Sequence, residues 1–257
     1  MSNDLFDAES GNAVVVALDH GIGLGAVPGY RDPAQTVERV LAAEPDGVLL
    51  SPRVVQSCRE TLEETDTDVI ITADYVALST VPNETGEIIQ TQPFDLDRIR
   101  RLEPAAVKVM LVFGQRDRQA QTANVEYVTR VAEAFDEIPV VVEAVLWGSQ
   151  IPERMRNDPE AIESACRIAW ELGADMLKIP YPEDQSSLER ITHGLSVPVF
   201  ILGGPSGARS ELFDGVQNAI DSGARGVIIG RSVWQAEDPG SVIAELKSIV
   251  HGDHHSG

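Results

Sequence analysis

Short hydrophobic segments alternate along this chain with longer segments in which hydrophobic and polar positions follow a helical period. The short segments are rich in β-branched residues and almost continuously hydrophobic, which is typical of strands buried on both faces. The predicted strands are residues 13–18, 47–50, 69–73, 106–111, 139–145, 175–179, 197–202 and 226–229. The predicted helices between and after them are residues 33–43, 54–62, 95–102, 124–135, 159–172, 187–193, 210–222 and 239–250.

Strict alternation of strand and helix predicts a parallel sheet. Eight such units in 257 residues favour a closed barrel over an open doubly wound sheet, because barrels of this type have about 250 residues. We therefore expect a single α/β domain, a (β/α)₈ TIM barrel over residues 1–250. Residues 251–257, which contain three histidines, are expected to form a flexible C-terminal tail. The third and fourth units are joined by residues 74–93, which are long for a barrel loop and are expected to form a hairpin or a lid.

Composition narrows the class of protein. The chain is 43% hydrophobic, enough for a large core, but it has neither a signal-peptide pattern nor an apolar run near the roughly 18 residues of a membrane span. It has only two cysteines, so a reducing cytoplasm is the expected location. The two cysteines do not have the spacing of a metal site, and no cofactor is expected. The net charge of −21 argues against nucleic acid and anionic membranes as partners.

The acidic residues are spread along the chain, and arginine supplies 17 of the 20 basic residues. Such a surface is typical of proteins adapted to high salt. At molar salt the Debye length is about 3 Å, so repulsion between the acidic side chains is screened. A halophilic protein is therefore one interpretation, and an ordinary acidic cytosolic enzyme is the other. A homo-oligomer is expected.

The lysines are the most informative residues, since there are only three. Lys247 lies on the polar face of the last predicted helix, whereas Lys108 and Lys178 interrupt the fourth and sixth predicted strands. Alternate strands of a barrel contribute side chains to the same interior layer, and the fourth and sixth strands are alternate. Both lysines can therefore face one cavity near the C-terminal mouth of the barrel. Two ammonium groups in a poorly hydrated site disfavour each other's charge, which makes a lysine a neutral amine nucleophile. The alternative is a buried lysine that is neutralised by a carboxylate only for stability.

Two carboxylates interrupt the odd-numbered strands in the same way. Asp19 ends the first strand and Glu143 lies in the fifth. An enzyme that forms a Schiff base needs a counter-ion for its lysines and an acid or base that carries protons, so these two are the candidates. Alternatively, each carboxylate only neutralises the buried lysines.

Glycine-bearing turns follow the last two strands, where barrels frequently bind phosphate. Glycine lets backbone N–H groups approach an anion, and an arginine adds a charged fork. The candidate phosphate-binding residues are Gly203, Gly204, Ser206, Gly230 and Arg231. Alternatively, these glycines form ordinary turns at strand ends and do not bind phosphate.

His20 and Trp147 also follow strands and are possible site residues, although either could be structural. No set of serine, cysteine and histidine resembles a nucleophile with its base. No cluster of metal ligands stands out, so we expect metal-independent chemistry.

Four motifs together resemble the archaeal-type class I fructose-bisphosphate aldolases, within the wider group of deoxyribose-phosphate and tagatose-bisphosphate aldolases. They are Asp19-His20-Gly21, Asp175-Met176-Leu177-Lys178, Gly203-Gly204-Pro205 and the segment from Gly230 to Gln235. The resemblance covers almost the whole chain. It implies that Lys178 is the Schiff-base lysine, that Asp19 takes part in proton transfer, and that the last two loops bind phosphate.

The fifth strand departs from the archaeal pattern, which has a Trp-Ser-Tyr-Pro-Arg-Gly type segment whose tyrosine donates a proton. Val145 takes the place of that tyrosine, and Ser206 takes the place of a frequent lysine. Glu143 and Lys108 instead fit the tagatose-bisphosphate aldolase pattern. The expected function is a class I aldolase, an aldehyde-lyase acting on a small sugar phosphate, with fructose 1,6-bisphosphate as the first substrate. The alternatives are a Schiff-base synthase or transaldolase such as 2-amino-3,7-dideoxyheptulosonate synthase, or a barrel that binds sugar phosphates without catalysis.

Overall fold

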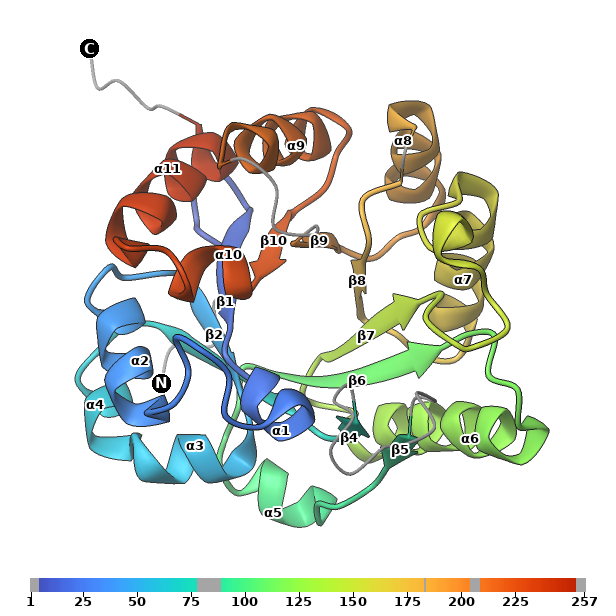
Figure 1. Cartoon of the computed structure of the whole chain (residues 1–257), viewed down its shortest axis with the longest axis horizontal. Coiled ribbons are helices and arrows are strands. Elements are labelled where there is room, and N and C mark those ends of the chain that lie inside the picture. The colour runs from blue at the N-terminus through green and yellow to red at the C-terminus, as the bar shows by residue number, and fades with distance from the viewer. Residues whose placement is uncertain (1–4, 78–88, 183, 204–208, 253–257) are drawn as a thin grey trace.

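The computed structural model describes residues 5–77, 89–182, 184–203 and 209–252 of the chain. Eight parallel strands close into a barrel in the order β1-β10-β9-β8-β7-β6-β3-β2, and helices surround it (Figure 1). The predicted TIM barrel is therefore confirmed.

The barrel strands lie close to the hydrophobic segments that predicted them. They are β1 (Ala13–Ala17), β2 (Gly47–Leu50), β3 (Asp68–Thr72), β6 (Ala106–Val112), β7 (Val140–Val145), β8 (Met176–Ile179), β9 (Val199–Leu202) and β10 (Gly226–Ile229). The α-helices are α1 (His20–Leu24), α2 (Pro33–Leu41), α3 (Pro52–Ser57), α4 (Arg59–Glu63), α5 (Leu96–Arg100), α6 (Arg118–Ala134), α7 (Pro159–Glu171), α8 (Gln185–Gly194), α9 (Arg209–Asp221), α10 (Arg231–Trp234) and α11 (Pro239–His251), and η1 (Glu153–Met155) is a 3₁₀ helix.

Aspartates fix the starts of several helices. Asp32, Asp158 and Asp238 each precede a proline, and each side chain accepts a hydrogen bond from a backbone N–H in the first helical turn. Proline is favoured at this position because its missing N–H would have no partner there in any case. The same kind of cap at Asp117 starts α6 six residues before the predicted position.

Alternate strand residues point to opposite faces, and this divides the core in two. Ala106, Val141 and Met176 belong to a cluster inside the barrel, whereas Val107 and Leu177 pack between the barrel and the helices. Because the side-chain period of a strand is two, the residues two positions after the inner ones also point inward. This parity carries the polar residues of β6, β7 and β8 into the barrel interior.

Residues 74–93, expected to form a hairpin or a lid, contain an antiparallel pair, β4 (Tyr75–Ala77) with β5 (Ile89–Thr91). The pair lies beside α1 and α6 (Figure 1). The chain between β4 and β5, residues 78–88, lies outside the described residues.

The last helix extends one residue past the predicted end of the barrel domain. His251 is the final residue of α11, and its ring contacts Asp46 Oδ2 at 2.9 Å and Ser10 Oγ at 2.8 Å. These contacts fasten this histidine to the N-terminal side of the barrel, so it does not belong to a flexible tail. Residues 253–257 lie outside the described part of the chain.

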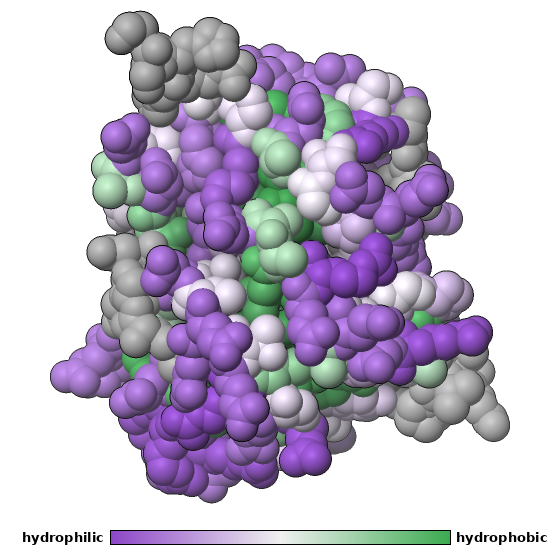
Figure 2. All heavy atoms as spheres, turned by 90° about the vertical axis from the view of Figure 1, so that its left-hand side faces the viewer, coloured by the Kyte–Doolittle hydropathy of each residue, from purple (hydrophilic) through white to green (hydrophobic). Residues whose placement is uncertain are grey.

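One face of the molecule is strongly polar. Figure 2 shows the face on the left of Figure 1, where hydrophilic side chains cover most of the area and hydrophobic ones form only a narrow strip. Within the described residues, no helix is both long and apolar enough to cross a membrane.

Candidate active site

Lys108 and Lys178 both lie inside the barrel, where the sequence places them. Their exposed fractions are 4% and 6%. Lys108 is on β6 and Lys178 on β8, and β7 separates the two strands. A buried ammonium group is stable only with ionic partners, so the surroundings of these lysines decide what they can do.

Glu143 on β7 joins the two lysines. Its Oε2 atom accepts hydrogen bonds from Lys178 Nζ at 3.0 Å and from Lys108 Nζ at 3.2 Å. The strand register explains this position, because Glu143 is directly opposite Lys178 on the neighbouring parallel strand. One carboxylate oxygen is thus placed within proton-transfer distance of both amines.

Asp19, Asp74 and Thr72 complete the surroundings of Lys108. Lys108 Nζ lies 3.5 Å from Asp19 Oδ2, 3.7 Å from Asp74 Oδ1 and 3.4 Å from Thr72 Oγ1. Asp74 is fixed in turn, because its Oδ2 accepts a hydrogen bond of 2.9 Å from the backbone N–H of Met110. Lys108 therefore has three carboxylates within 4 Å, of which the sequence had suggested only Asp19 and Glu143.

These contacts determine the ionisation of Lys108. Burial disfavours its charge, but attraction by Glu143, Asp74 and Asp19 outweighs burial and raises the pKa of Lys108 above its ordinary value. The expectation of a lowered pKa is therefore wrong for Lys108. The physical reason is that three carboxylates lie within 4 Å of Lys108 Nζ, an arrangement that the sequence pattern did not indicate.

The lysines in turn favour the ionised forms of Glu143 and Asp19. Burial opposes the charge of Glu143, but Lys178 and Lys108 outweigh it and lower the pKa of Glu143. For Asp19, attraction by the same two lysines likewise outweighs burial and lowers the pKa. Glu143 and Asp19 thus form a buried cluster with the two lysines, in which each carboxylate lies within 4 Å of a lysine amine.

His20 lies beside this cluster at the start of α1. Burial, reinforced by the nearby Lys178 and Arg231, lowers the pKa of His20, and attraction by Asp19 only partly opposes this effect. Its ring packs edge-on against Trp234, and its Nδ1 atom has no hydrogen-bond partner among the described residues. His20 is therefore a neutral imidazole at pH 7.

Gly230 is required where β10 leads into α10. A Cβ atom at this position would lie 2.2 Å from His20 Cε1 and 2.8 Å from the carbonyl oxygen of Ala17. The absence of a side chain lets the His20 ring pack against the end of β10. This is a steric role, distinct from the phosphate-binding role suggested by the sequence.

A cavity of about 280 Å³ opens above the cluster. Its lining includes both lysines, all three carboxylates, His20, Trp147 and Arg231. Arg231 thus reaches the same cavity as Lys178, as the sequence had suggested. Gly203 is at the end of β9, and Gly204 and Ser206 lie outside the described residues.

Comparison with known proteins identifies the family. The pattern of the DeoC/LacD family aldolases matches residues 13–236. The chain belongs to this family. An uncharacterized aldolase of Saccharolobus solfataricus is 26% identical over 96% of this chain and 92% of the relative. The 2-amino-3,7-dideoxy-D-threo-hept-6-ulosonate synthase of Halobacterium salinarum is 28% identical over 93% of this chain and 87% of the relative.

A solved structure of a Schiff-base-forming fructose-1,6-bisphosphate aldolase, studied through its reaction intermediates, is also similar. It is 26% identical, its TM-score is 0.78, and the alignment covers 96% of each chain. The relatives of this DeoC/LacD aldolase thus include both a fructose-bisphosphate aldolase and a synthase. The expected resemblance to the aldolase group is confirmed, and the substrate is left open.

Sequence reasoning missed two polar residues of this aldolase's cavity, Thr72 and Asp74. Both lie at the C-terminal end of β3, where polar side chains of a barrel face the active site. That position was the available signal. It was overlooked because Asp74 begins the long segment that was expected to form a hairpin or a lid.

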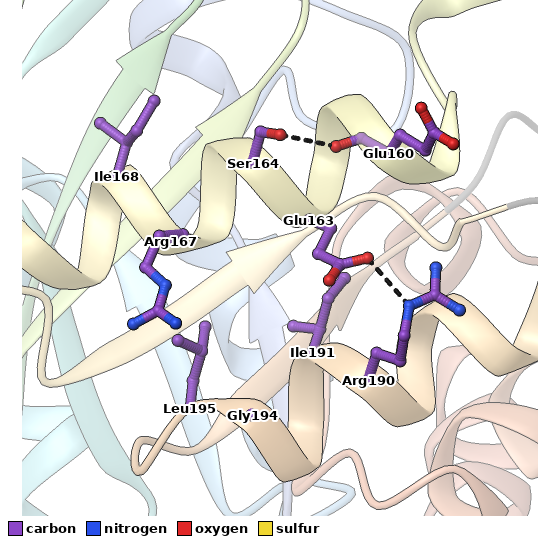
Figure 3. Close-up of a pocket in the computed structure, with 9 residues that line it drawn as sticks. All are labelled: Glu160, Glu163, Ser164, Arg167, Ile168, Arg190, Ile191, Gly194 and Leu195. Carbon is purple, nitrogen blue, oxygen red and sulfur yellow. Dashed lines mark hydrogen bonds and ion pairs between the residues drawn. The ribbon is translucent and has the colours of Figure 1, made fainter.

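A larger cavity, of about 500 Å³, lies outside the barrel between α7 and α8 (Figure 3). Its polar side chains are mostly exposed, and Glu163 and Arg190 form an ion pair across it, with Arg190 Nε 3.0 Å from Glu163 Oε2. It contains none of the buried amines or carboxylates that aldol chemistry uses. Among the described residues, no group of three or more histidine, cysteine, aspartate or glutamate side chains is placed to hold a metal ion.

Proposed function

We propose that this aldolase is a class I enzyme that cleaves or forms a phosphorylated ketose through a Schiff base on Lys178. The observation that carries the proposal is the contact between Lys178 Nζ and Glu143 Oε2 at 3.0 Å, buried in a cavity that Arg231 also lines. The resemblance to Schiff-base aldolases supports the choice of Lys178 over Lys108. Lys108 is the less suitable nucleophile, because its raised pKa keeps it an ammonium group, which cannot attack a ketone.

In the proposed reaction, the neutral amine of Lys178 adds to the ketone carbon to form a carbinolamine, which loses water to give an iminium ion. The carboxylate of Glu143 then accepts the proton of the C4 hydroxyl group, and the C3–C4 bond breaks. The aldehyde leaves, and the electron pair of the broken C3–C4 bond moves toward the iminium nitrogen to form an enamine on Lys178. Protonation of the enamine and hydrolysis of the imine release the second product and regenerate the amine.

The surrounding residues support these steps. Lys108 stays charged and can stabilise negative charge that develops on the substrate oxygens. Asp19, 3.5 Å from Lys108 Nζ, is the second candidate for proton transfer. Arg231, with the glycine-bearing ends of β9 and β10, is proposed to bind the substrate phosphate.

The substrate stays a proposal at the level of class. One candidate reaction is cleavage of a ketose phosphate, which the similarity to a fructose-bisphosphate aldolase supports, and the other is a synthase reaction, because the Halobacterium salinarum relative is named a synthase. In the proposed scheme, both reactions begin with an imine on Lys178. A barrel that only binds sugar phosphates would form no imine.

Borohydride reduction tests the proposal, because it converts an imine into a stable secondary amine. With dihydroxyacetone phosphate as the ketone, we expect the adduct on Lys178, located by peptide mass spectrometry, in buffer with or without EDTA. Lys178→Met should abolish the adduct and turnover yet preserve the fold, since methionine fills a similar volume without a buried charge. Lys247→Met removes a surface lysine and is the matched control. An adduct on Lys108, or no adduct at all, would refute the assignment.

A further inference from the structure

We propose that the substrate carries a single phosphate, bound on the Arg231 side of the cavity, and that its aldehyde half is uncharged and faces an apolar patch. This inference rests on the proposed function, and it selects within the class of phosphorylated ketoses. It argues for a ketose monophosphate and against a ketose bisphosphate such as fructose 1,6-bisphosphate.

The order of the barrel strands places the groups along the cavity. Arg231 follows β10, and β10 is four strands away from β6 in either direction around the barrel. Lys178 is on β8, which is midway between β10 and β6. A ketose that is bound by its phosphate at Arg231 and by its carbonyl carbon at Lys178 therefore extends toward β6 and its neighbours.

The wall on that opposite side contains Lys108, Thr72 and Asp74, but it also has an apolar patch. Met110 comes from β6, Val76 from β4 and Trp147 from the end of β7, and all three line the cavity. They belong to one hydrophobic cluster that also includes Val112 and Val145. The aldehyde half of the substrate meets carbon and indole surface there, which favours contact with uncharged, apolar groups.

The charges of the lining give the same result. Among the described lining residues, Arg231 forms no ion pair with a described carboxylate, whereas Lys178 contacts Glu143 and Lys108 contacts three carboxylates. Away from Arg231 the lining thus carries two lysines and three carboxylates, a formal excess of negative charge. A second phosphate dianion there would lose its hydration to face net negative charge, which is unfavourable.

The segments outside the described residues supply no further lysine or arginine. Residues 1–4, 78–88, 183, 204–208 and 253–257 contain neither lysine nor arginine. All 20 basic residues of the chain therefore lie in the described part, where the cavity is lined by Lys108, Lys178 and Arg231.

Binding of two matched ligands tests the inference without any chemical step. Hexyl phosphate and hexane-1,6-diyl bisphosphate have the same six-carbon chain and lack a carbonyl group, so neither can form an imine. Isothermal titration at one fixed ionic strength should give hexyl phosphate a Kd lower by about tenfold or more, which corresponds to 1.4 kcal/mol. Equal or tighter binding of the bisphosphate would overturn the inference, and so would the absence of hexyl phosphate binding.

Three variants assign the effect to the two ends of the cavity. Arg231→Gln should weaken hexyl phosphate binding about tenfold or more. Arg167→Gln, which removes the same charge from the larger cavity between α7 and α8 (Figure 3), should leave binding unchanged. Trp147→Arg places a cation on the apolar patch and should reverse or abolish the preference for the monophosphate. An unchanged preference in a folded Trp147→Arg protein would contradict the placement of the aldehyde half.

The outcome separates this inference from the proposed function. If dihydroxyacetone phosphate is trapped on Lys178 but the bisphosphate binds more tightly, the aldolase proposal stands and the single-phosphate inference fails. If hexyl phosphate is preferred but no imine can be trapped, the aldolase proposal fails and so does any inference about its substrate.

Discussion

The carboxylate of Glu143 shares a single oxygen atom between two buried lysines, and this arrangement divides their roles. Lys108 has two further carboxylates within 4 Å, so it is held as an ammonium ion. Lys178 has Glu143 as its described ionic partner and lines the cavity in which the ketone is proposed to bind. The pair therefore combines a permanent cation with a candidate nucleophile, linked by a group that can move a proton.

Removal of the Lys108 charge tests this division. In Lys108→Met, Lys178 becomes the main cation among three buried carboxylates, which favours its ammonium form over the reactive amine. Imine formation measured by borohydride trapping should slow about tenfold or more near pH 7 and recover in part at higher pH. Breaking a buried ion pair also destabilises the fold, by about 3–5 kcal/mol. Trapping at the wild-type rate at neutral pH would show that Lys108 does not control the nucleophile.

Glu143→Gln should give the opposite pattern. The amide keeps the shape of the side chain but cannot accept the proton of the C4 hydroxyl group, so imine should form while carbon–carbon cleavage stalls. We expect a normal yield of trapped adduct with turnover reduced by about 10²-fold or more. Glu143→Asp, which keeps the charge but shortens its reach, is the control for loss of the counter-ion. Full turnover in a folded Gln variant would transfer the proton-carrier role to Asp19.

The same variant has a predicted pH signature in stability. The pKa of Glu143 is lowered in the fold, so its ionised form contributes stability that is present above its ordinary value of 4.5 and is lost as pH falls through the lowered value. Thermal unfolding followed between pH 3 and pH 7 should therefore depend less on acid in Glu143→Gln than in the wild-type protein.

At the scale of elements, the junctions where strands lead into helices position the site. β7 and β8 lie in a register that puts Glu143 opposite Lys178, and β10 ends in a glycine that leaves room for His20. Such junctions tolerate little change, whereas the middle of an outer helix does not touch the site.

Two glycine substitutions test this contrast. Gly230→Ala should push away the His20 ring, because its Cβ would lie 2.2 Å from Cε1, and should raise KM for the phosphorylated substrate about tenfold while the barrel still folds. Gly215→Ala is the matched control in α9, where a Cβ would meet no atom within 4 Å apart from its chain neighbours and the backbone of its own helix. Alanine is favoured over glycine inside helices, so this control should gain about 0.5–1 kcal/mol of stability with unchanged kinetics. An unaltered KM in Gly230→Ala would refute the steric role.

At the scale of the whole molecule, charge is the dominant feature. The net charge is −21, and hydrophilic side chains cover most of the face in Figure 2. Like charges on one surface repel and destabilise the compact state, and salt shortens the range of this repulsion from about 10 Å at 0.1 M to about 3 Å at 1 M.

We therefore expect the melting temperature to rise with KCl toward the molar range. A gain of about 2 kcal/mol would raise the melting temperature of a chain of this size by roughly 4–8 °C. Sucrose at matched osmolality is the control, because it stabilises by exclusion from the surface without screening charge. A melting temperature that is flat or falls with KCl, measured by differential scanning calorimetry, would remove the high-salt interpretation.

The sequence by itself determined the barrel and the placement of its polar residues along each strand. Alternation of hydrophobic segments with amphipathic ones encodes the strand and helix order, and the period of two decides which face each residue takes. That is why Lys108, Glu143 and Lys178 could be predicted to point into one interior. These properties depend on neighbours along the chain, so they can be read from it directly.

Only the tertiary structure decided which charges meet and which walls face each other. The contact of Asp74 with Lys108 joins residues 34 positions apart in sequence, and it depends on the register between β3 and β6. The apolar patch opposite Arg231 depends on closure of the sheet, which brings β6 across from β10. Hydrophobic patterning leaves register and closure unspecified, because a strand keeps the same pattern whichever partner it pairs with. The ionisation of Lys108 and the polarity of the two ends of the cavity follow from that pairing.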